Sequence, residues 1–377
     1  MAVVLAGLGT YVYWVELPEE RAKTQTETEE KKILPFEERE ITDLTVRSEM
    51  GEVVLTSKNG AWKITSPVQA DADSRTVEAM IRALVLGKVS RVVEEAATAL
   101  APFGLEKPSA VLTVSADSRQ ETLSLGDSGP ISSTLYAMRA SDKKVLLTDL
   151  APKDFLNKSV LTFRKKEVLH VDVSQAERLR LTYPKTEIVL YRIDDNENKK
   201  KWKIRYPIEA SADEPEIRRL LMKLEDLKAL GFIDPGPQRD ELMKRLTRPE
   251  MKITVHVGGM DYAVRLFQPD PSSGEAFAVT APDAPIYRIN PMAIKDLSKE
   301  LFTLQDKRLL GIDKDAIAML TVKTRGEQYT LIRQNDTWVL EDDPNTKLDQ
   351  EKAAVFVSRV ADLPAELRVV KQAGPLT

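Results

Sequence analysis

A pattern of apolar and polar positions recurs three times along the chain, and each copy contains a tryptophan. Before each tryptophan, apolar and polar residues alternate with a period of two, in runs separated by turn residues such as Lys-Asn-Gly, Arg-Gly and Asn-Asp. This alternation is typical of three antiparallel strands joined by hairpins. It places Trp62, Trp202 and Trp338 on the third strand of each copy. One shared position on a sheet favours a tryptophan that packs under a helix over one that stacks on a ligand.

An aspartate follows each tryptophan after eleven residues, at Asp73, Asp213 and Asp349. Apolar residues then occur 4, 7, 8 and 11 positions after the aspartate, which is the stripe of an amphipathic helix. We therefore expect each aspartate to be an N-cap that accepts hydrogen bonds from free backbone N–H groups. Acid catalysis and metal binding are the alternatives, and the spacing to the helix explains the aspartates without either.

The third copy departs from the first two. Its proline, Pro344, follows the tryptophan by six residues, whereas Pro67 and Pro207 follow theirs by five. Lys-Leu also replaces the alanine before the aspartate. We interpret the third copy as a terminal capping unit.

Two strand-rich segments alternate with the tryptophan copies. Each contains a proline, a strand, a turn, a second strand, a loop rich in Gly, Ser and Pro, two short strands, and a helix that begins near Pro152 or Pro291. The sequence therefore predicts an α+β fold of tandem repeated modules. Each module is an antiparallel β-meander with a packed helix, forming its own small layer in an elongated chain.

The first fifteen residues carry no charged side chain and end in Tyr11, Tyr13 and Trp14, which favour a membrane interface. A helix of this length spans about 22 Å, short of the roughly 30 Å hydrocarbon core. We expect one uncleaved transmembrane helix that precedes the modules. A cleaved signal peptide and a buried soluble segment are the alternatives.

The pattern divides the chain into seven segments. They are a transmembrane anchor (1–17), a stalk or linker (18–38), a first tryptophan-type module (39–95), a first strand-rich module (96–166), a second tryptophan-type module (167–236), a second strand-rich module (237–308) and a third tryptophan-type module (309–377).

Composition narrows the possible functions. The 377 residues are 42% apolar and 30% charged, which is typical of a soluble body of two or three domains. With 55 basic and 59 acidic side chains the net charge is −4, so no net positive field is available to hold a nucleic acid. Cysteine is absent, which excludes disulfides and thiolate chemistry.

Candidate chemical groups are few. His170 and His256 lie in strand patterns of different segment types, and neither has a zinc-binding motif around it. No phosphate-binding loop or serine-hydrolase motif is present, and Gly258 and Gly259 lie between two strands, where a hairpin turn is the better interpretation. The acidic pairs lie at a helix cap or in polar turns; they are Asp71 with Asp73, Asp194 with Asp195, and Asp342 with Asp343. We predict a non-enzymatic protein without catalytic, cofactor-binding or metal-binding residues.

Several motifs together resemble a known bacterial family. They are the hydrophobic N-terminus, the W-x-I/L…P…A-D motif before a helix, the F-G-L-x-x-P run from Phe103 to Pro108, and the L-G…Y-x-x-R element from Leu125 to Arg139. The chain is similar, over nearly all of its length after the anchor, to the family known as domain of unknown function 4340. The resemblance implies a membrane-anchored extracytoplasmic accessory protein. Its partners would be an ABC-2-type permease, the ATPase and the auxiliary subunit of gliding-motility-type ABC transporters.

Two functions remain open at this stage. The first is a scaffold in the bacterial inner membrane, with a single membrane pass and its body in the periplasm or outside the cell, that contacts a transporter through sheet edges or the loops 127–133 and 268–274. The alternative is a periplasmic protein that binds a glycan, a lipid or a peptide in a cleft between modules. Lys199–Lys201 could touch anionic lipid headgroups or simply be solvated. The positive-inside rule disagrees with an extracytoplasmic body, because the basic residues near the anchor all follow it.

Overall fold

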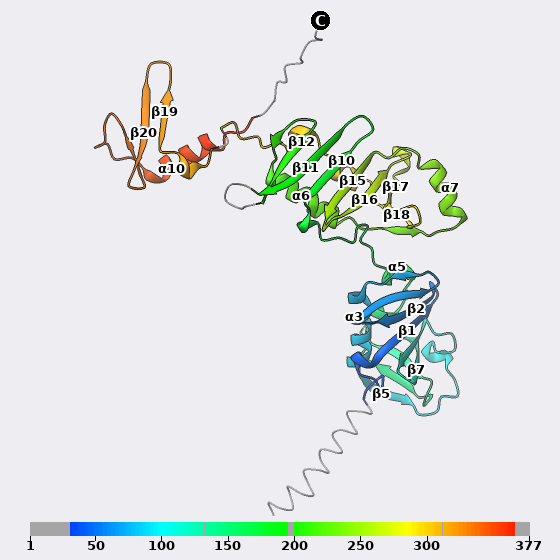
Figure 1. Cartoon of the computed structure of the whole chain (residues 1–377). Helices are drawn as coiled ribbons and strands as arrows, with labels where there is room; N and C mark the ends of the chain where they lie inside the picture. The colour runs from blue at the N-terminus through cyan, green and yellow to red at the C-terminus, as the bar shows by residue number, and fades with distance from the viewer. Residues whose placement is uncertain (1–30, 132, 195–199, 311, 366–377) are drawn as a thin grey trace, which may run out of the picture. The chain divides into compact units, whose positions relative to one another are not determined.

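The computed structural model describes residues 31–131, 133–194, 200–310 and 312–365, and the chain forms two compact units, Met1–Lys166 and Glu167–Thr377. The predicted anchor, with Tyr11, Tyr13 and Trp14, lies outside the described residues. Within the described ranges, none of the helices has the length and apolar character needed to cross a membrane. Antiparallel sheets with packed helices make up both units (Figure 1), which confirms the mixed α and β fold with tandem repeats.

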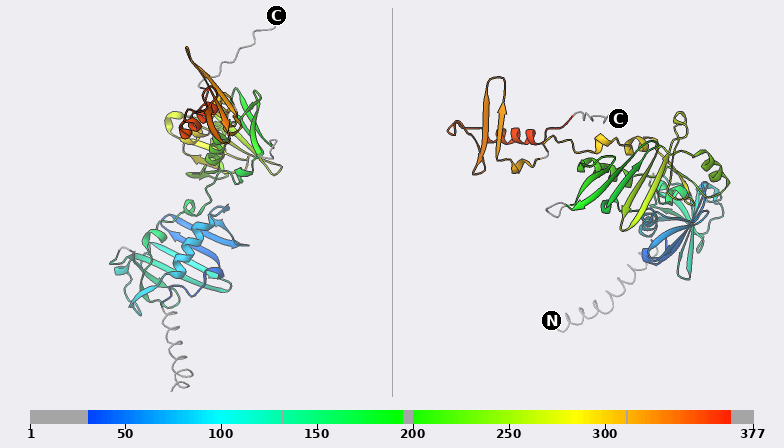
Figure 2. Two further views of the ribbon diagram at one scale, coloured as in Figure 1. Left: turned by 90° about the vertical axis from the view of Figure 1, so that its left-hand side faces the viewer. Right: turned by 45° about the horizontal axis from the view of Figure 1, so that its top comes forward.

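One nine-stranded antiparallel sheet forms the first unit, in the order β4-β3-β2-β1-β6-β7-β8-β9-β5. Its strands are β1 (Ile41–Ser48), β2 (Gly51–Lys58), β3 (Ala61–Ser66), β4 (Ala70–Asp71), β5 (Val89–Glu94), β6 (Ala110–Ala116), β7 (Arg119–Ser128), β8 (Leu135–Arg139) and β9 (Val145–Thr148). Its helices are α3 (Ser74–Leu86), α4 (Pro152–Phe155) and α5 (Val160–Phe163). Figure 2 shows α3 lying across one face of this sheet.

The second unit repeats this strand order as β13-β12-β11-β10-β15-β16-β17-β18-β14. Its strands are β10 (Arg178–Thr182), β11 (Glu187–Asp194), β12 (Lys200–Tyr206), β13 (Ala210–Ser211), β14 (Gly231–Ile233), β15 (Met251–Val257), β16 (Met260–Phe267), β17 (Ala276–Val279) and β18 (Ile286–Ile289). Its helices are α6 (Glu214–Glu225), α7 (Pro237–Arg245), α8 (Met292–Leu297) and α9 (Leu301–Leu304). The predicted turn at Gly258 and Gly259 joins β15 to β16 as a hairpin.

The expectation that each module forms a separate layer is wrong for the first four modules. β1 pairs with β6 and β10 pairs with β15, so a tryptophan-type module and the following strand-rich module share one sheet and one core. A separate β1 would leave a row of backbone N–H and C=O groups without partners beside a buried face. Pairing with β6 satisfies those groups and joins the two apolar faces.

The prediction that residues 18–38 form a stalk is wrong for the last part of that range, and residues 18–30 lie outside the described residues. Ile33 and Leu34 are fully buried in the core of the first unit, and Phe36 is 4% exposed. The backbone N–H of Val89 donates a hydrogen bond to the carbonyl oxygen of Lys31 at 2.8 Å. The apolar run that follows Lys32 is therefore part of the folded unit, because burying it removes large apolar side chains from water.

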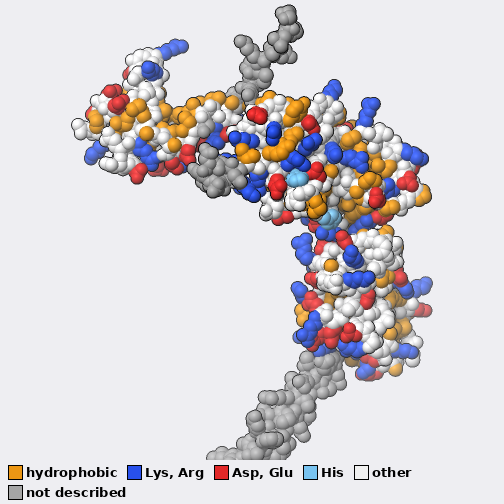
Figure 3. All heavy atoms as spheres, viewed as in Figure 1, with side chains coloured by type: hydrophobic (Ala, Val, Ile, Leu, Met, Phe, Trp, Pro, Cys, Tyr) orange, Lys and Arg blue, Asp and Glu red, His pale blue; other side chains and the backbone are white. Residues whose placement is uncertain are grey.

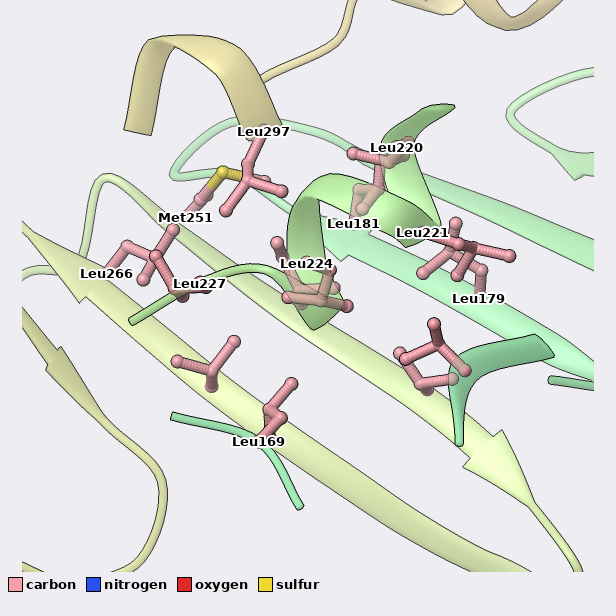
Figure 4. Close-up of a cluster of buried hydrophobic side chains, with 14 of the residues drawn as sticks. Leu169, Leu179, Leu181, Leu220, Leu221, Leu224, Leu227, Met251, Leu266 and Leu297 are labelled. Atoms are coloured by element: carbon pink, nitrogen blue, oxygen red, sulfur yellow. The ribbon is translucent and has the colours of Figure 1, made fainter. Parts of the chain in front are cut away.

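The core of the second unit lies between its sheet and the helix α6. Figure 4 shows leucines of α6 above leucines of β10, with Leu297 of α8 beside them. The four apolar residues of the predicted stripe, Ile217, Leu220, Leu221 and Leu224, are all buried. The same holds for Val77, Met80, Ile81 and Leu84 of α3.

A third and smaller sheet follows in the second unit. We call β19 (Met319–Lys323), β20 (Gln328–Gln334), β21 (Thr337–Leu340) and α10 (Gln350–Ala361) the third module. The small core of the third module contains Trp338 and Val357. The stripe prediction is wrong here for Phe356, which is 42% exposed. Its counterpart Met80 is buried in the first unit, where α4 and α5 of the following strand-rich segment pack on α3. In the third module α10 contacts β21 and the short 3-10 helix Lys314–Ala316.

The two large sheets differ beside the interior strands β7 and β16. In the first unit Gly126 lies against the backbone of Phe103 and Gly104, so the chain before β6 approaches the sheet closely. The second unit has Phe267 at the corresponding place, in a small core beneath α7. Glycines in the family-like motifs F-G-L and L-G therefore serve a close backbone approach in the first unit.

Candidate functional site

The three motif aspartates are helix N-caps. A carboxylate oxygen of Asp73 accepts from the backbone N–H of Arg75 at 3.1 Å, that of Asp213 from Glu216 at 3.0 Å, and that of Asp349 from Lys352 at 3.1 Å. The backbone N–H of Lys352, and then its side chain, hold the pKa of Asp349 below its ordinary value. These contacts stabilise the first turn of each helix.

The residue after each aspartate holds the tryptophan strand. The backbone N–H of the tryptophan donates to the side chain of Ser74 at 3.4 Å in the first copy, of Glu214 in the second, and of Gln350 at 2.7 Å in the third. This bond ties the start of the helix to the third strand of the meander. It is a contact that the sequence motif did not reveal.

The third copy, whose motif differs from the first two between the tryptophan and the aspartate, also differs in the hydrogen bond that its tryptophan carbonyl accepts. The carbonyl oxygens of Trp62 and Trp202 accept hydrogen bonds from the backbone N–H groups of Ala72 and Ala212, which follow β4 and β13. The described part of the third module contains no such fourth strand. There the side-chain amide of Gln350 donates to the carbonyl oxygen of Trp338 at 2.8 Å and replaces the backbone donor.

The repeated motif therefore builds structure at each of its three positions. The tryptophan side chains are 5–6% exposed and lie in three separate hydrophobic cores. Among the residues that the structure describes, His, Asp and Glu side chains nowhere form a group of three close enough to hold a metal ion. One candidate surface is the face of the second sheet that points away from α6.

A row of side chains crosses five strands on that face of the second sheet. Strand register places Lys203 beside Tyr191, Tyr191 beside Arg178, Arg178 beside His256, and His256 beside Asp261. We call these five residues the charged row. Figure 3 shows blue Lys and Arg side chains around a pale blue histidine on the second unit.

Two short contacts hold one end of the charged row. Asp261 Oδ1 lies 2.6 Å from His256 Nδ1 and 2.9 Å from Arg178 Nη2. The hydrogen bonds from His256 and then Arg178 hold the pKa of Asp261 below its ordinary value. The same aspartate raises the pKa of the Arg178 guanidinium.

Cationic and aromatic groups make up the other end. The guanidinium carbons of Arg178 and Arg205 lie 6.0 and 5.4 Å from the centre of the Tyr191 ring, within the range of cation–π attraction. A shallow hollow of about 380 Å³ beside Tyr191 is lined by Lys203, Arg205 and Glu209 as well. This arrangement suits a ligand with an anionic group, because guanidinium groups pair with carboxylate or phosphate in two-point contacts.

The corresponding row of the first sheet has different chemistry. Register places Lys63, Thr56, Asp43, Ser115 and Gln120 at the same positions. Thr56 Oγ1 donates to Asp43 Oδ1 at 2.8 Å, and the row contains no aromatic ring. The charged row is thus a property of the second unit and not of the repeated fold.

Acid should weaken the Asp261 end of the charged row. Because the folded pKa of Asp261 is lowered, its ionised contacts stabilise the β15–β16 hairpin above the unfolded pKa of about 3.9, and this contribution is lost as the pH falls through the lower folded pKa. Carboxyl NMR titration should give a midpoint below 3.9, and amide exchange in the hairpin should accelerate in the same pH range. Asp261→Asn should remove that pH dependence, and an ordinary midpoint for Asp261 would contradict the contacts.

Comparison with known proteins identifies one family. A family model described as "Domain of unknown function (DUF4340)" matches residues 62–244 and again residues 245–374. The junction between the matches lies at the end of α7, inside the second unit, so neither match corresponds to one sheet. Comparisons with curated proteins and with solved structures gave no match.

Proposed function

We propose that this chain, which belongs to the domain of unknown function 4340 family, is a non-enzymatic accessory scaffold of an ABC-type transporter complex in the bacterial envelope. One observation carries the proposal. The residues that repeat along the chain are used for the same helix caps, strand contacts and cores in every copy. The repetition therefore enlarges the folded surface of the chain. A scaffold needs such a surface to contact several other proteins.

The proposed setting follows from the N-terminal sequence and the family resemblance. Residues 1–17 serve as a single-pass anchor in the inner membrane, and the folded units lie in the periplasm or outside the cell. The proposed partners are the ABC-2-type permease, its ATPase and the auxiliary membrane subunit. The outer faces and edges of the sheets are the surfaces offered to them.

Co-purification from native membranes tests the scaffold. The full chain, tagged at its C-terminus and extracted in mild detergent, should bring down permease and ATPase subunits in fixed ratio. A variant without residues 1–17 but with a cleavable export signal controls for the anchor, and it should lose most of this association. Recovery of the chain free of both subunits at native abundance would contradict the proposal. Protease protection in spheroplasts would test the location of the folded units.

Binding of an anionic ligand is a second candidate function, and the charged row favours it. Tyr191 lies between the guanidinium groups of Arg178 and Arg205, while Lys203 adds a third cation at the edge of the hollow. Anionic lipid headgroups are the ligand class that basic side chains near a membrane most often attract. The proposed anchor would keep the chain at a bilayer that contains such headgroups.

Charge reversal measures this binding. The double variant Lys203→Glu/Arg205→Glu should lower binding to phosphatidylglycerol vesicles by about tenfold or more, since each basic residue near an anionic surface contributes about 1 kcal/mol. Lys63→Glu is the matched control, because Lys63 occupies the position of Lys203 in the first sheet. Vesicle flotation at two salt concentrations provides the measurement. Equal loss in the double variant and the control, or no loss in either, would exclude the charged row as the lipid site.

A further inference from the structure

The strand β19 repeats a sequence found in β1. Leu320-Thr321-Val322 lies 18 residues before Trp338, and Leu44-Thr45-Val46 lies 18 residues before Trp62. Both triplets are in the first strand of a three-stranded meander. β19 and β1 are therefore equivalent strands, and the neighbour of β1 shows what the edge of β19 can accept.

In the first unit a strand with the same triplet covers β1. β6 contains Leu112-Thr113-Val114 and runs antiparallel to β1. The pairs are Leu44 with Val114, Thr45 with Thr113, and Val46 with Leu112. In the second unit the similar triplet Ile253-Thr254-Val255 of β15 faces Leu179-Arg180-Leu181 of β10, so only the first unit pairs two Leu-Thr-Val triplets. A Leu-Thr-Val strand is thus complementary to an antiparallel copy of itself.

The edge of β19 away from β20 has no strand beside it among the described residues. The backbone N–H of Arg333 donates to the oxygen of Ala318 at 2.9 Å, and that of Thr324 donates to the oxygen of Glu327 at 2.9 Å. Because hydrogen-bonding direction alternates along an antiparallel strand, Thr321 then directs its N–H and C=O toward the open edge, as do Met319 and Lys323. Such an edge is a template for another strand.

We propose that β19 pairs in antiparallel orientation with β19 of a second copy of this chain. The two strands are related by a two-fold axis that passes midway between the two copies of Thr321. The pairing sets Leu320 opposite Val322 and Thr321 opposite Thr321, which reproduces the β1–β6 pairs. Lys323 falls opposite Met319, so like charges are not opposed. The two meanders join in a six-stranded sheet, and the two-fold axis places both α10 helices on one face.

A row of threonines would run continuously through this six-stranded sheet. Thr321 Oγ1 lies 3.2 Å from Thr330 Oγ1 on β20, just as Thr113 Oγ1 lies 3.1 Å from Thr122 Oγ1 on β7. In the first unit the row continues from Thr113 to Thr45 on β1. The second copy of Thr321 takes the place of Thr45, so the dimer uses contacts that the first unit already contains.

Cysteine cross-linking tests the register, since the chain contains no cysteine of its own. Facing Cα atoms of a hydrogen-bonded antiparallel pair are about 5.5 Å apart, within disulfide range. Full-length Thr321→Cys in mild oxidant should give a covalent dimer. Lys323→Cys alone should not, because its two copies are offset by four residues, roughly 13 Å. A mixture of Met319→Cys and Lys323→Cys chains should give the mixed dimer.

A proline at the centre tests the backbone pairing. Thr321→Pro removes the N–H that points to the open edge and leaves the β19–β20 hydrogen bonds in place, which is where an edge strand tolerates proline. By sedimentation, it should raise the dimer dissociation constant at least about tenfold. Thr321→Val keeps the N–H and should stay dimeric. Circular dichroism and Trp338 fluorescence should show both variants folded.

Three results would overturn the proposal. One is a full-length chain that stays monomeric at about 100 µM. The second is a Thr321→Cys chain that forms no more covalent dimer than Lys323→Cys. The third is an intramolecular disulfide in a chain that carries both Thr321→Cys and a second cysteine placed within residues 366–377, which would make the chain its own partner.

Discussion

Replacing Trp202 by alanine should reduce the unfolding free energy of the second unit by about 3–5 kcal/mol, the usual cost of removing a large buried aromatic side chain. Trp202 is 5% exposed and belongs to the large core beneath α6. Its backbone is held by Glu214 and Ala212, so neighbouring atoms are not free to fill the space. The cavity would therefore persist.

Denaturant unfolding measures this loss of unfolding free energy. Amide hydrogen exchange then shows whether the loss is confined to the second unit. Trp202→Phe should cost less than alanine because it retains a ring. Trp338→Ala provides a second comparison, and its loss should be smaller and confined to the third module, whose core is small. A Trp202→Ala protein that unfolds within about 1 kcal/mol of the wild type would mean that this tryptophan is not a packing residue.

Replacing Gly126 by alanine should destabilise the first unit by about 3 kcal/mol, at the upper end of overpacking effects. A Cβ at Gly126 would overlap the carbonyl oxygen of Phe103 and press on Gly104 and Leu105. Backbone atoms cannot rotate away as a flexible side chain can, so either β7 or the segment before β6 must move. Both belong to motifs that carry the family resemblance.

Gly231→Ala in the second unit is the matched control. A Cβ there would lie 3.5 Å from Cδ of Arg288, an ordinary contact with a flexible side chain. Its unfolding free energy should therefore change by about 1 kcal/mol or less. Thermal unfolding of both variants measures the two changes in stability. Amide hydrogen exchange then shows which of the two units is destabilised in each variant. Equal stability of Gly126→Ala and Gly231→Ala would show that the close approach is not needed.

Local features of this fold could be predicted from the sequence. Hairpin turns, the tryptophan on the third strand and the aspartate at the helix start depend on residues within about 20 positions of one another. The union of two modules in one sheet could not be predicted, because β1 and β6 are separated by some 70 residues and alternation alone does not choose a partner strand. The exposure of Phe356 escaped prediction for a related reason, since the helices that pack on α3 in the first unit, α4 and α5, come from the following strand-rich segment and not from the tryptophan-type repeat.

The charged row shows the same limit for a site. Its five residues are spread from Arg178 to Asp261, and only strand register brings them together. The sequence did contain a partial signal, in the Lys-Trp-Lys-Ile-Arg run of β12, where every outward position is basic. The first copy reads Ala-Trp-Lys-Ile-Thr at that place. Comparing outward positions between repeats would therefore have pointed to the second unit.

The shared Leu-Thr-Val triplet also has a consequence during synthesis, because it determines which strands can pair with β1 before β6 has been made. At about 5–20 residues per second, β6 follows β1 after roughly 3–14 s, and through that interval the edge of β1 is open. Neighbouring nascent chains on one message offer β6 strands of the same sequence. Exchange of β6 between such chains is the misassembly that we expect for this architecture. When few ribosomes translate one message, β1 should pair with β6 of its own chain, because the covalent link gives that strand a higher effective concentration than a strand of another chain.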